Sequence, residues 1–162
     1  MNSDTVTAIA ATVIALGSLW VSYTQAKESR LHSHQSVRPV LQVRRFKERG
    51  DSKAGIEVIN AGLGPAIVTK SVVRLDGEEI GQWNYHTQER VSESLSVRPE
   101  AFSLRPGAVV LAGQSTFLFA LEEFSEDQHD WFWNLITRRL VIEIHYESLY
   151  GGEDFKAMSP AF

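Results

Sequence analysis

The N-terminal segment Thr5–Thr24 carries no charged side chain. A helix needs roughly 20 residues to cross the hydrocarbon core of a bilayer, and this segment has that length. Trp20 and Tyr23 lie near its end, where aromatic side chains favour the membrane interface, and Lys27 and Arg30 follow. The pattern predicts a transmembrane helix over residues 5–24 whose partner is the lipid bilayer, with these four residues at the interface.

Two other interpretations of this segment stay open. A cleaved signal peptide normally has a basic region before its apolar run, whereas the charged residue here is Asp4. A core helix of a soluble domain would also fit, since several Thr and Ser residues make the run only moderately hydrophobic.

The flanking charges predict an orientation for the transmembrane interpretation. Lys27, Arg30 and Arg38 follow the run, and no Lys or Arg precedes it. The positive-inside rule then places the C-terminal domain in the cytoplasm, at the inner membrane of a bacterial cell. The alternative is an envelope-facing, periplasmic domain.

The chain is expected to divide near residue 36. No proline occurs between Tyr23 and Pro39, and the residue before a proline avoids helical angles. We therefore expect one long helix over residues 1–36 and a separate domain over residues 37–162. The absence of cysteine excludes disulfides and thiolate metal sites, and a net charge of −4 gives no reason to expect a nucleic acid polymer as partner.

After Pro39, apolar and polar residues alternate in short runs separated by turn signals. Seven to nine such runs predict a mainly β fold, an immunoglobulin-like sandwich of two sheets. Strict alternation in residues 66–75 would put Ile67 and Ser71 on one face and Val68 and Lys70 on the other. Asp-Gly at 76–77 predicts a hairpin turn. The expected strands cover residues 39–46, 55–60, 66–75, 78–83, 101–104, 108–112, 115–122, 140–149 and 153–159.

One or two short helices are expected within the sandwich. Residues 86–95 predict a short surface helix, and residues 125–139 give the stronger helical pattern. Ser125 and Gln128 have the spacing of a capping box, in which each side chain bonds to the backbone of the other.

Residues 58–68, VINAGLGPAIV, place two glycines and a proline between apolar runs, so a phosphate-binding loop has to be considered. A phosphate loop leads into a helix, whereas the alternating residues after Pro65 predict a strand. We interpret Gly62 and Gly64 as residues with unusual backbone angles at a corner between strands.

The corner also carries a resemblance. The segments SVRPVLQV, GIEVINAGLGPAIV, VVRLDG and HYESLYGGEDF resemble those of small bacterial membrane-anchored proteins of unknown function. In that group an N-terminal helix precedes an immunoglobulin-like sandwich with an N-x-G-x-G-P-A corner. The resemblance spans most of the chain and implies a fold and an anchor, but no catalytic residue.

Two groups of residues are candidates for binding. Arg44, Arg45, Lys47 and Arg49 form a basic cluster that either protects an edge strand or binds an anionic ligand or lipid headgroup. Trp131, Phe132 and Trp133 are adjacent aromatic residues that cannot all face one core, so one of them either packs partly shielded or meets a partner. The histidines are too scattered for a metal site, and no cofactor is expected.

The sequence therefore predicts a binding or interaction module without catalysis, held at the inner membrane by its helix. Its partner would be another protein, or a second copy in an oligomer. The first alternative is an effector or sensor that binds a small anionic, nucleotide-like signal and oligomerises to perturb the membrane. The second is the envelope-facing interaction domain.

Overall fold

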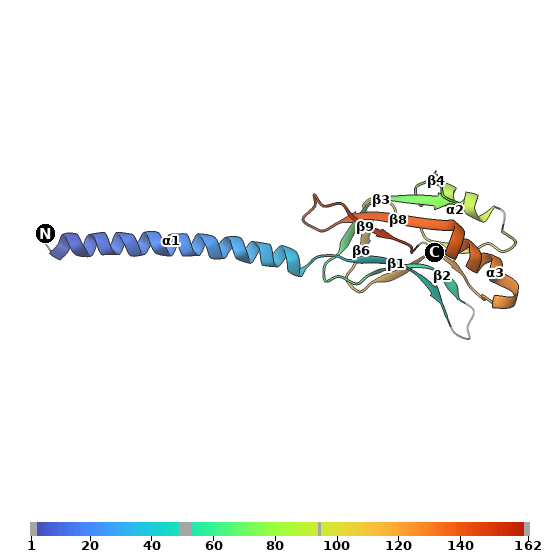
Figure 1. Ribbon diagram of the computed structural model, residues 1–162, viewed down its shortest axis with the longest axis horizontal. Coiled ribbons are helices and arrows are strands. Elements are labelled where there is room, and N and C mark those ends of the chain that lie inside the picture. Colours follow the sequence, from blue (N-terminus) through green and yellow to red (C-terminus); the bar gives the residue numbers. More distant parts are fainter. Residues whose placement is uncertain (1–2, 49–52, 94, 161–162) are drawn as a thin grey trace. The chain divides into compact units, whose positions relative to one another are not determined.

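The computed structural model describes residues 3–48, 53–93 and 95–160 (Figure 1). The chain forms two compact units that divide after Ser36, and each is described by itself. The first unit is helix α1, Ser3–Ser36, which ends where the sequence predicts. Among the helical residues that the structure describes, no stretch combines the length and the apolarity needed to cross a membrane. The predicted helix is thus confirmed, while its insertion into a bilayer stays a prediction.

The second unit, residues 37–162, contains two antiparallel β-sheets, which confirms a mainly β, two-sheet fold (Figure 1). The strand order of the first sheet is β1 (Leu41–Lys47), β2 (Ala54–Asn60), β7 (Ser115–Leu121) and β5 (Glu100–Ala101). The order of the second is β4 (Glu78–Gly81), β3 (Ala66–Leu75), β8 (Leu140–Glu147) and β9 (Phe155–Met158), with β6 (Val109–Val110) paired to β3.

The core contains a cluster of fully buried aromatic rings from different elements. The Phe119 ring on β7 lies 5.6 Å from the rings of both Trp83 and Phe132, measured between centroids. Burying a large aromatic side chain contributes roughly 1.5–3 kcal/mol from its apolar area alone. The cluster therefore fixes the helical insertions onto the sheets.

The expected alternation of β3 is interrupted. The pairing of β3 with β8 shifts between Val68 and Lys70, which leaves Thr69 as a bulge. Val68 and Ser71 are therefore both buried, whereas strict alternation put them on opposite faces. A bulge adds one residue to one strand and changes which side chains face the core beyond it.

Two helical segments interrupt the strands, as the sequence predicts. Helix α2 spans Tyr85–Ser92, and the Asn84 side chain caps it by accepting a hydrogen bond from the Thr87 amide at 3.1 Å. Helix α3 spans Glu126–Asn134 and continues as a wider π-type turn, η1, over Leu135–Arg139. The expected capping box is wrong, because the Ser125 side chain makes no cap; instead the Ser125 amide donates to His129 Nδ1 at 3.0 Å.

The corner after β2 is built around the fully buried side chain of Asn60. Its Nδ2 donates to the carbonyl oxygens of Gly64 and Val110, at 2.8 and 3.0 Å. Its Oδ1 accepts from the amides of Val40 and Gly62, at 3.1 and 3.0 Å. One side chain thus ties together the chain before β1, the corner and β6.

The glycines of the corner are required by close approach rather than by backbone angles. Neither Gly62 nor Gly64 is among the described glycines with positive φ, so the expectation of unusual angles is wrong. A Cβ on Gly64 would lie 1.7 Å from the Val37 carbonyl oxygen, and one on Gly62 would lie 2.4 Å from the Arg38 oxygen. Only glycine lets the corner pack this tightly against residues 37–40.

Candidate functional site

The basic cluster of β1 is engaged with neighbouring residues. Arg44 Nε lies 2.7 Å from Glu57 Oε2, whose side chain is buried. Arg45 Nε donates to the Ile136 carbonyl oxygen at 2.6 Å, and burial lowers the pKa of its guanidinium. Lys47 pairs with Glu126. Replacing Arg44 by Glu would therefore place two carboxylates together and disturb the fold as well as any ligand.

The fourth member of the cluster, Arg49, lies outside the residues that the structure describes. The ammonium group of Lys47 also lies over two aromatic rings, 5.4 Å from the Phe124 centroid and 5.2 Å from the Trp133 centroid. The three described members thus brace β1 against β2 and the α3 segment. Anion binding by this cluster stays a prediction.

The aromatic run of α3 divides between core and surface. Phe132 is fully buried, whereas Trp131 and Trp133 are half-buried and pack against the core. The Trp131 ring contacts those of His129 and Phe132 edge-on. The two tryptophans present partial ring surfaces to solvent, and contact with a partner there stays a prediction.

The predicted interface residues lie on α1. Trp20 and Tyr23 are 72% and 69% exposed, and Lys27 is also exposed; the structure does not describe the Arg30 side chain. Exposed apolar side chains continue along this helix, namely Ile9, Val13, Ile14, Leu16, Leu19 and Val21. Within its own unit, this apolar surface is uncovered.

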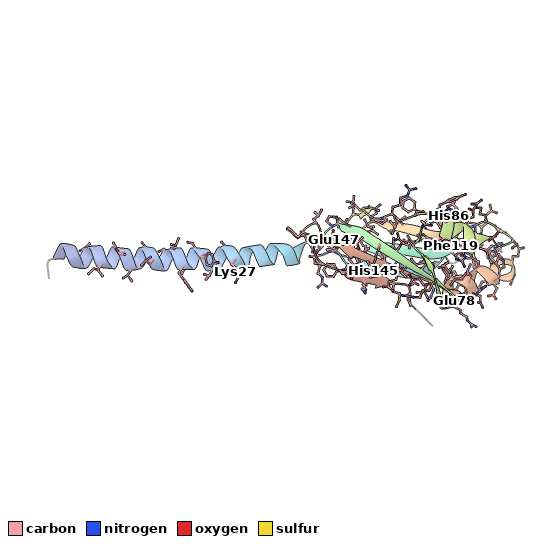
Figure 2. All side chains as sticks on the ribbon, turned by 90° about the horizontal axis from the view of Figure 1, so that it is seen from above. Lys27, Glu78, His86, Phe119, His145 and Glu147 are labelled. Carbon is pink, nitrogen blue, oxygen red and sulfur yellow. The ribbon has the colours of Figure 1, made fainter. Side chains whose placement is uncertain are left out.

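A buried histidine on β8 lies between two carboxylates. The side chain of His145 is only 3% exposed, and its Nδ1 and Nε2 each lie 2.8 Å from a carboxylate oxygen, of Asp154 and Glu143 respectively. Arg74 Nη1 donates to the other oxygen of Glu143 at 3.1 Å. An imidazolium can donate to both carboxylates, whereas a neutral ring can donate to only one. We call these four residues the His145 network. His145 is labelled in Figure 2.

The His145 network is arranged for structure rather than for known chemistry. Its two carboxylates lie on opposite sides of the ring, so they do not converge on one metal ion. Both ring nitrogens already face carboxylates, which leaves neither in position to accept a proton from a hydroxyl nucleophile. Within the described ranges, no three His, Asp or Glu side chains are grouped to hold a metal.

Hydrogen bonds lower the pKa of both carboxyl groups in the network. The bond from His145 lowers the pKa of Asp154, and the bond from Arg74, followed by that from His145, lowers the pKa of Glu143. A carboxylate with a lowered pKa stabilises the fold above its ordinary pKa, near 4, and this stabilisation is lost as the pH falls through the lowered value.

We therefore expect the melting temperature to fall more steeply on acidification in the native chain than in Asp154→Asn or Glu143→Gln. Melting curves between about pH 6 and pH 3 would measure this slope. Asp130→Asn, an exposed change on α3, is the control for removing one negative charge. Parallel profiles for all of these chains would contradict the assignment.

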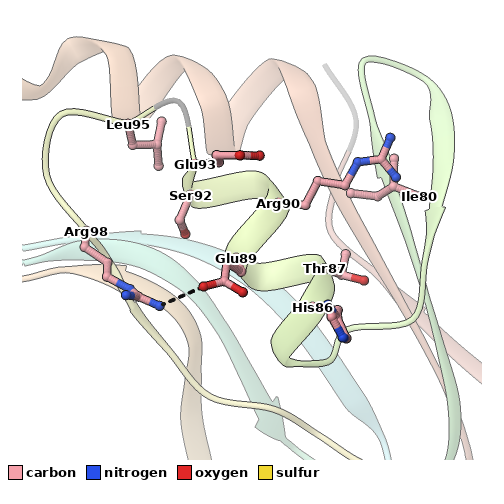
Figure 3. A pocket seen from close by; sticks show the side chains of 9 residues that line it. All are labelled: Ile80, His86, Thr87, Glu89, Arg90, Ser92, Glu93, Leu95 and Arg98. Atoms are coloured by element: carbon pink, nitrogen blue, oxygen red, sulfur yellow. Dashed lines mark ion pairs between the residues drawn. The ribbon is translucent and has the colours of Figure 1, made fainter.

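A concave site in the sandwich lies around α2, between β4 and the segment 95–98 (Figure 3). Its volume is about 760 Å³, within the usual range for small-molecule sites. Its lining residues are Ile80, His86, Thr87, Glu89, Arg90, Ser92, Glu93, Leu95 and Arg98. We call this the α2 pocket.

Charged side chains of both signs line the α2 pocket, two arginines and two glutamates. Glu89 and Arg98 point toward one another across it, with Arg98 Nη2 4.0 Å from Glu89 Oε1 (Figure 3). Both side chains are more than half exposed, so this ion pair is weak and a ligand can separate it. Arg90 and His86 supply further donors. The lining can therefore bind a small polar molecule that carries negative charge, while Glu89 and Glu93 accept hydrogen bonds from its donors.

Sequence reasoning missed both the α2 pocket and the His145 network. The signal for the network was present, because Glu143 and His145 are two residues apart on a strand and share a face, and Gly151-Gly152 marks a turn that returns the chain to Asp154. The α2 pocket had no such signal, since its two arginines come from a helix and a loop.

Comparison with known proteins adds one finding to this geometry. A family model matches residues 6–159, which covers most of α1 and nearly the whole sandwich. No curated protein and no solved structure matches the chain. The match includes helix and sandwich together.

Proposed function

The chain belongs to the family described as Domain of unknown function (DUF8453), and we propose that it is a membrane-anchored binding module without catalysis. In this proposal α1 anchors the chain in the bacterial inner membrane. The domain of residues 37–162, an immunoglobulin-like sandwich, then binds another protein or a second copy of the chain on the cytoplasmic side.

The observation that carries the proposal is the apolar surface of α1. Its residues from Thr5 to Thr24 are uncharged, and the described apolar side chains among them are exposed around the helix. An apolar surface that no other element covers is stabilised when lipid or protein surrounds it. No described helical stretch has the length and apolarity of a membrane span, so the anchoring in this proposal depends on this surface and on the charges that follow it.

We expect the full chain to float with phospholipid vesicles in a sucrose gradient and to resist extraction with carbonate. A variant with Val13→Lys and Leu16→Lys should remain at the bottom of the gradient, because each charge opposes burial in hydrocarbon by roughly 2.5–3.5 kcal/mol. Gln42→Lys and Gln128→Lys, on exposed residues of the sandwich, add the same two positive charges as a control. Free sedimentation of the native chain without detergent would remove the anchor from the proposal.

A separate experiment tests on which side of the membrane the sandwich lies. Because the chain has no cysteine, Glu78→Cys gives a single thiol on the sandwich. We expect a membrane-impermeant maleimide to label it in lysed cells but not in spheroplasts. Labelling in intact spheroplasts would favour the envelope-facing alternative.

The α2 pocket favours a second candidate, the effector or sensor that binds a small anionic signal. Arg90 and Arg98 suit an anion better than Arg44 and Arg45, because the Arg98–Glu89 pair is long and exposed whereas Arg44 and Arg45 are held by contacts of 2.7 and 2.6 Å. We expect saturable binding of pyrophosphate to the detergent-solubilised chain by calorimetry, with affinity at least tenfold weaker in Arg90→Gln with Arg98→Gln. Arg138→Gln, exposed on η1, is the control. Equal affinity for pyrophosphate in the native chain and in both variants would exclude the α2 pocket as the binding site.

A further inference from the structure

Three loops meet at the end of the sandwich that contains Asn60. The Asn60 side chain binds the carbonyl oxygens of Gly64 and Val110, and the Asn60 carbonyl accepts from the Gly113 amide at 2.9 Å. The Tyr146 hydroxyl, at the end of β8, accepts from the Leu41 amide at 3.1 Å. These bonds bring loops 61–65, 111–114 and 148–152 to one end, together with residues 37–40. We call it the corner end.

The loops of the corner end expose apolar tips. Leu63 is 78% exposed, Leu111 59%, Leu149 63% and Tyr150 49%. No charged residue occurs in any of the three loops. A single exposed leucine is ordinary on a protein surface, whereas four large apolar side chains on three uncharged loops at one end define a contact surface.

The opposite end of the sandwich has the reverse character. Its hairpin turn and the approach to α3 are strongly charged, and Glu78 is labelled there in Figure 2. The charged residues are Asp76, Glu78, Glu79, Glu122, Glu123, Glu126, Asp127, Arg138 and Arg139. The apolar tips are therefore a property of the corner end and not of the composition of the domain.

The carboxylates nearest the tips are engaged in local hydrogen bonds, although the Asp154 side chain is 60% exposed. Glu147 accepts from the Gly152 amide at 3.1 Å, Glu153 accepts from the Ser148 hydroxyl at 2.9 Å, and Asp154 bonds to His145. Arg38, whose carbonyl accepts from the Leu63 amide, and Arg105, in the segment before β6, are both exposed. The surface thus combines apolar tips with exposed arginines and with carboxylates that already accept hydrogen bonds, and the apolar and cationic parts suit a layer of phospholipid headgroups.

We propose that the apolar tips of the corner end insert into the headgroup region of the bilayer. This inference rests on the proposed anchoring and extends it from α1 to the sandwich. The occupant is lipid rather than a second copy because Val37, which adjoins these loops, directly follows the helix that carries the uncharged run, and because aromatic and aliphatic tips with cationic neighbours match an interface. Helix α1 is continuous over Ser3–Ser36, and residues 25–36 span about 18 Å as a helix, so the contact requires α1 to tilt strongly or to bend after the uncharged run.

The experiment uses single-cysteine forms of the full chain, which has no cysteine of its own. Leu63→Cys and Leu149→Cys report on the tips, and Glu78→Cys and Glu123→Cys on the opposite end. Each thiol carries a nitrobenzoxadiazole dye, and the chain is reconstituted in vesicles of phosphatidylethanolamine and phosphatidylglycerol with nitroxide-labelled lipid. We expect lipid quenching at the tips to exceed that at the opposite end at least threefold.

Flotation of the same vesicles separates this inference from the anchoring. Vesicles that float with the chain but show equal quenching at both ends would overturn the inference and leave the anchor standing. Tips that are shielded from aqueous iodide yet not quenched by lipid would assign the surface to a second copy instead, and would also overturn it. A chain that does not float would overturn both.

A second set of variants tests the apolar side chains themselves. With the dye at Ala112→Cys, an exposed position in loop 111–114, Leu63→Ser with Leu149→Ser should reduce lipid quenching at least twofold. Val97→Ser with Met158→Ser removes exposed apolar side chains elsewhere on the sandwich and should leave quenching unchanged. An equal reduction by both pairs would contradict a specific role of the tips, and unchanged melting curves would show that each variant is folded.

Discussion

Replacing Asn60 by Ala is expected to destabilise the sandwich by about 4 kcal/mol, a large part of the 5–15 kcal/mol that holds a typical domain folded. The change removes four hydrogen bonds of one fully buried side chain. Two carbonyl oxygens and two amides would then lose their partner, and each unsatisfied buried group costs roughly 1–3 kcal/mol before any water enters. Urea unfolding followed by tryptophan fluorescence would measure the loss.

Gln42→Ala is the matched control for this change. Gln42 lies on the neighbouring strand β1 but is exposed, so its removal should change the stability by less than about 0.5 kcal/mol. Amide hydrogen exchange gives a local measure, because the Val40 and Gly62 amides donate to the Asn60 side chain. Native-like protection of both amides in Asn60→Ala would contradict the role given to this residue.

Replacing Gly64 by Ala should cost more than about 3 kcal/mol, which is high for the addition of a single methyl group. The new Cβ would lie 1.7 Å from the Val37 carbonyl oxygen and 2.6 Å from the Val37 carbonyl carbon. Both are backbone atoms, so no rotation of a side chain relieves the overlap, and residues 37–40 would have to move away from the corner. Urea unfolding measures the cost.

Gly77→Ala separates steric overlap from backbone strain. Gly77 has a φ of +86° in the β3–β4 turn, and no atom lies within 4 Å of the Cβ it would gain. Its replacement should cost only about 1–2 kcal/mol, the penalty of a left-handed residue. If Gly64→Ala were no more harmful than Gly77→Ala, the close approach at the corner would not be what requires glycine.

The sequence predicts strands where local pattern and tertiary packing agree. The Asp76-Gly77 turn is confirmed with positive φ at both residues, and α1 ends at Ser36, just before the segment that leads to Pro39. The bulge at Thr69 was not predictable in this way, because alternation describes a regular strand and a bulge depends on the partner strand. The function of the corner glycines was likewise hidden, since close approach is a property of two distant segments.

In the candidate sites, too, the contacts between distant segments could not be predicted from the sequence. The charges of β1 are plain in the sequence, but which carboxylate or carbonyl each one meets depends on β2 and on η1. His145 is one of five scattered histidines until the β8–β9 hairpin brings Asp154 to its ring. A pattern can therefore give the kind of side chain and its face, whereas partners from other elements require the fold.

The clamp around Asn60 also has a mechanical consequence. Any pull transmitted along the chain from α1 reaches the sandwich through residues 37–40, and these are held by Asn60, Ala61 and Leu63. The load is therefore shared by several bonds before it can peel Leu41 from its neighbour on β2. A domain built in this way resists being unravelled from its N-terminal end.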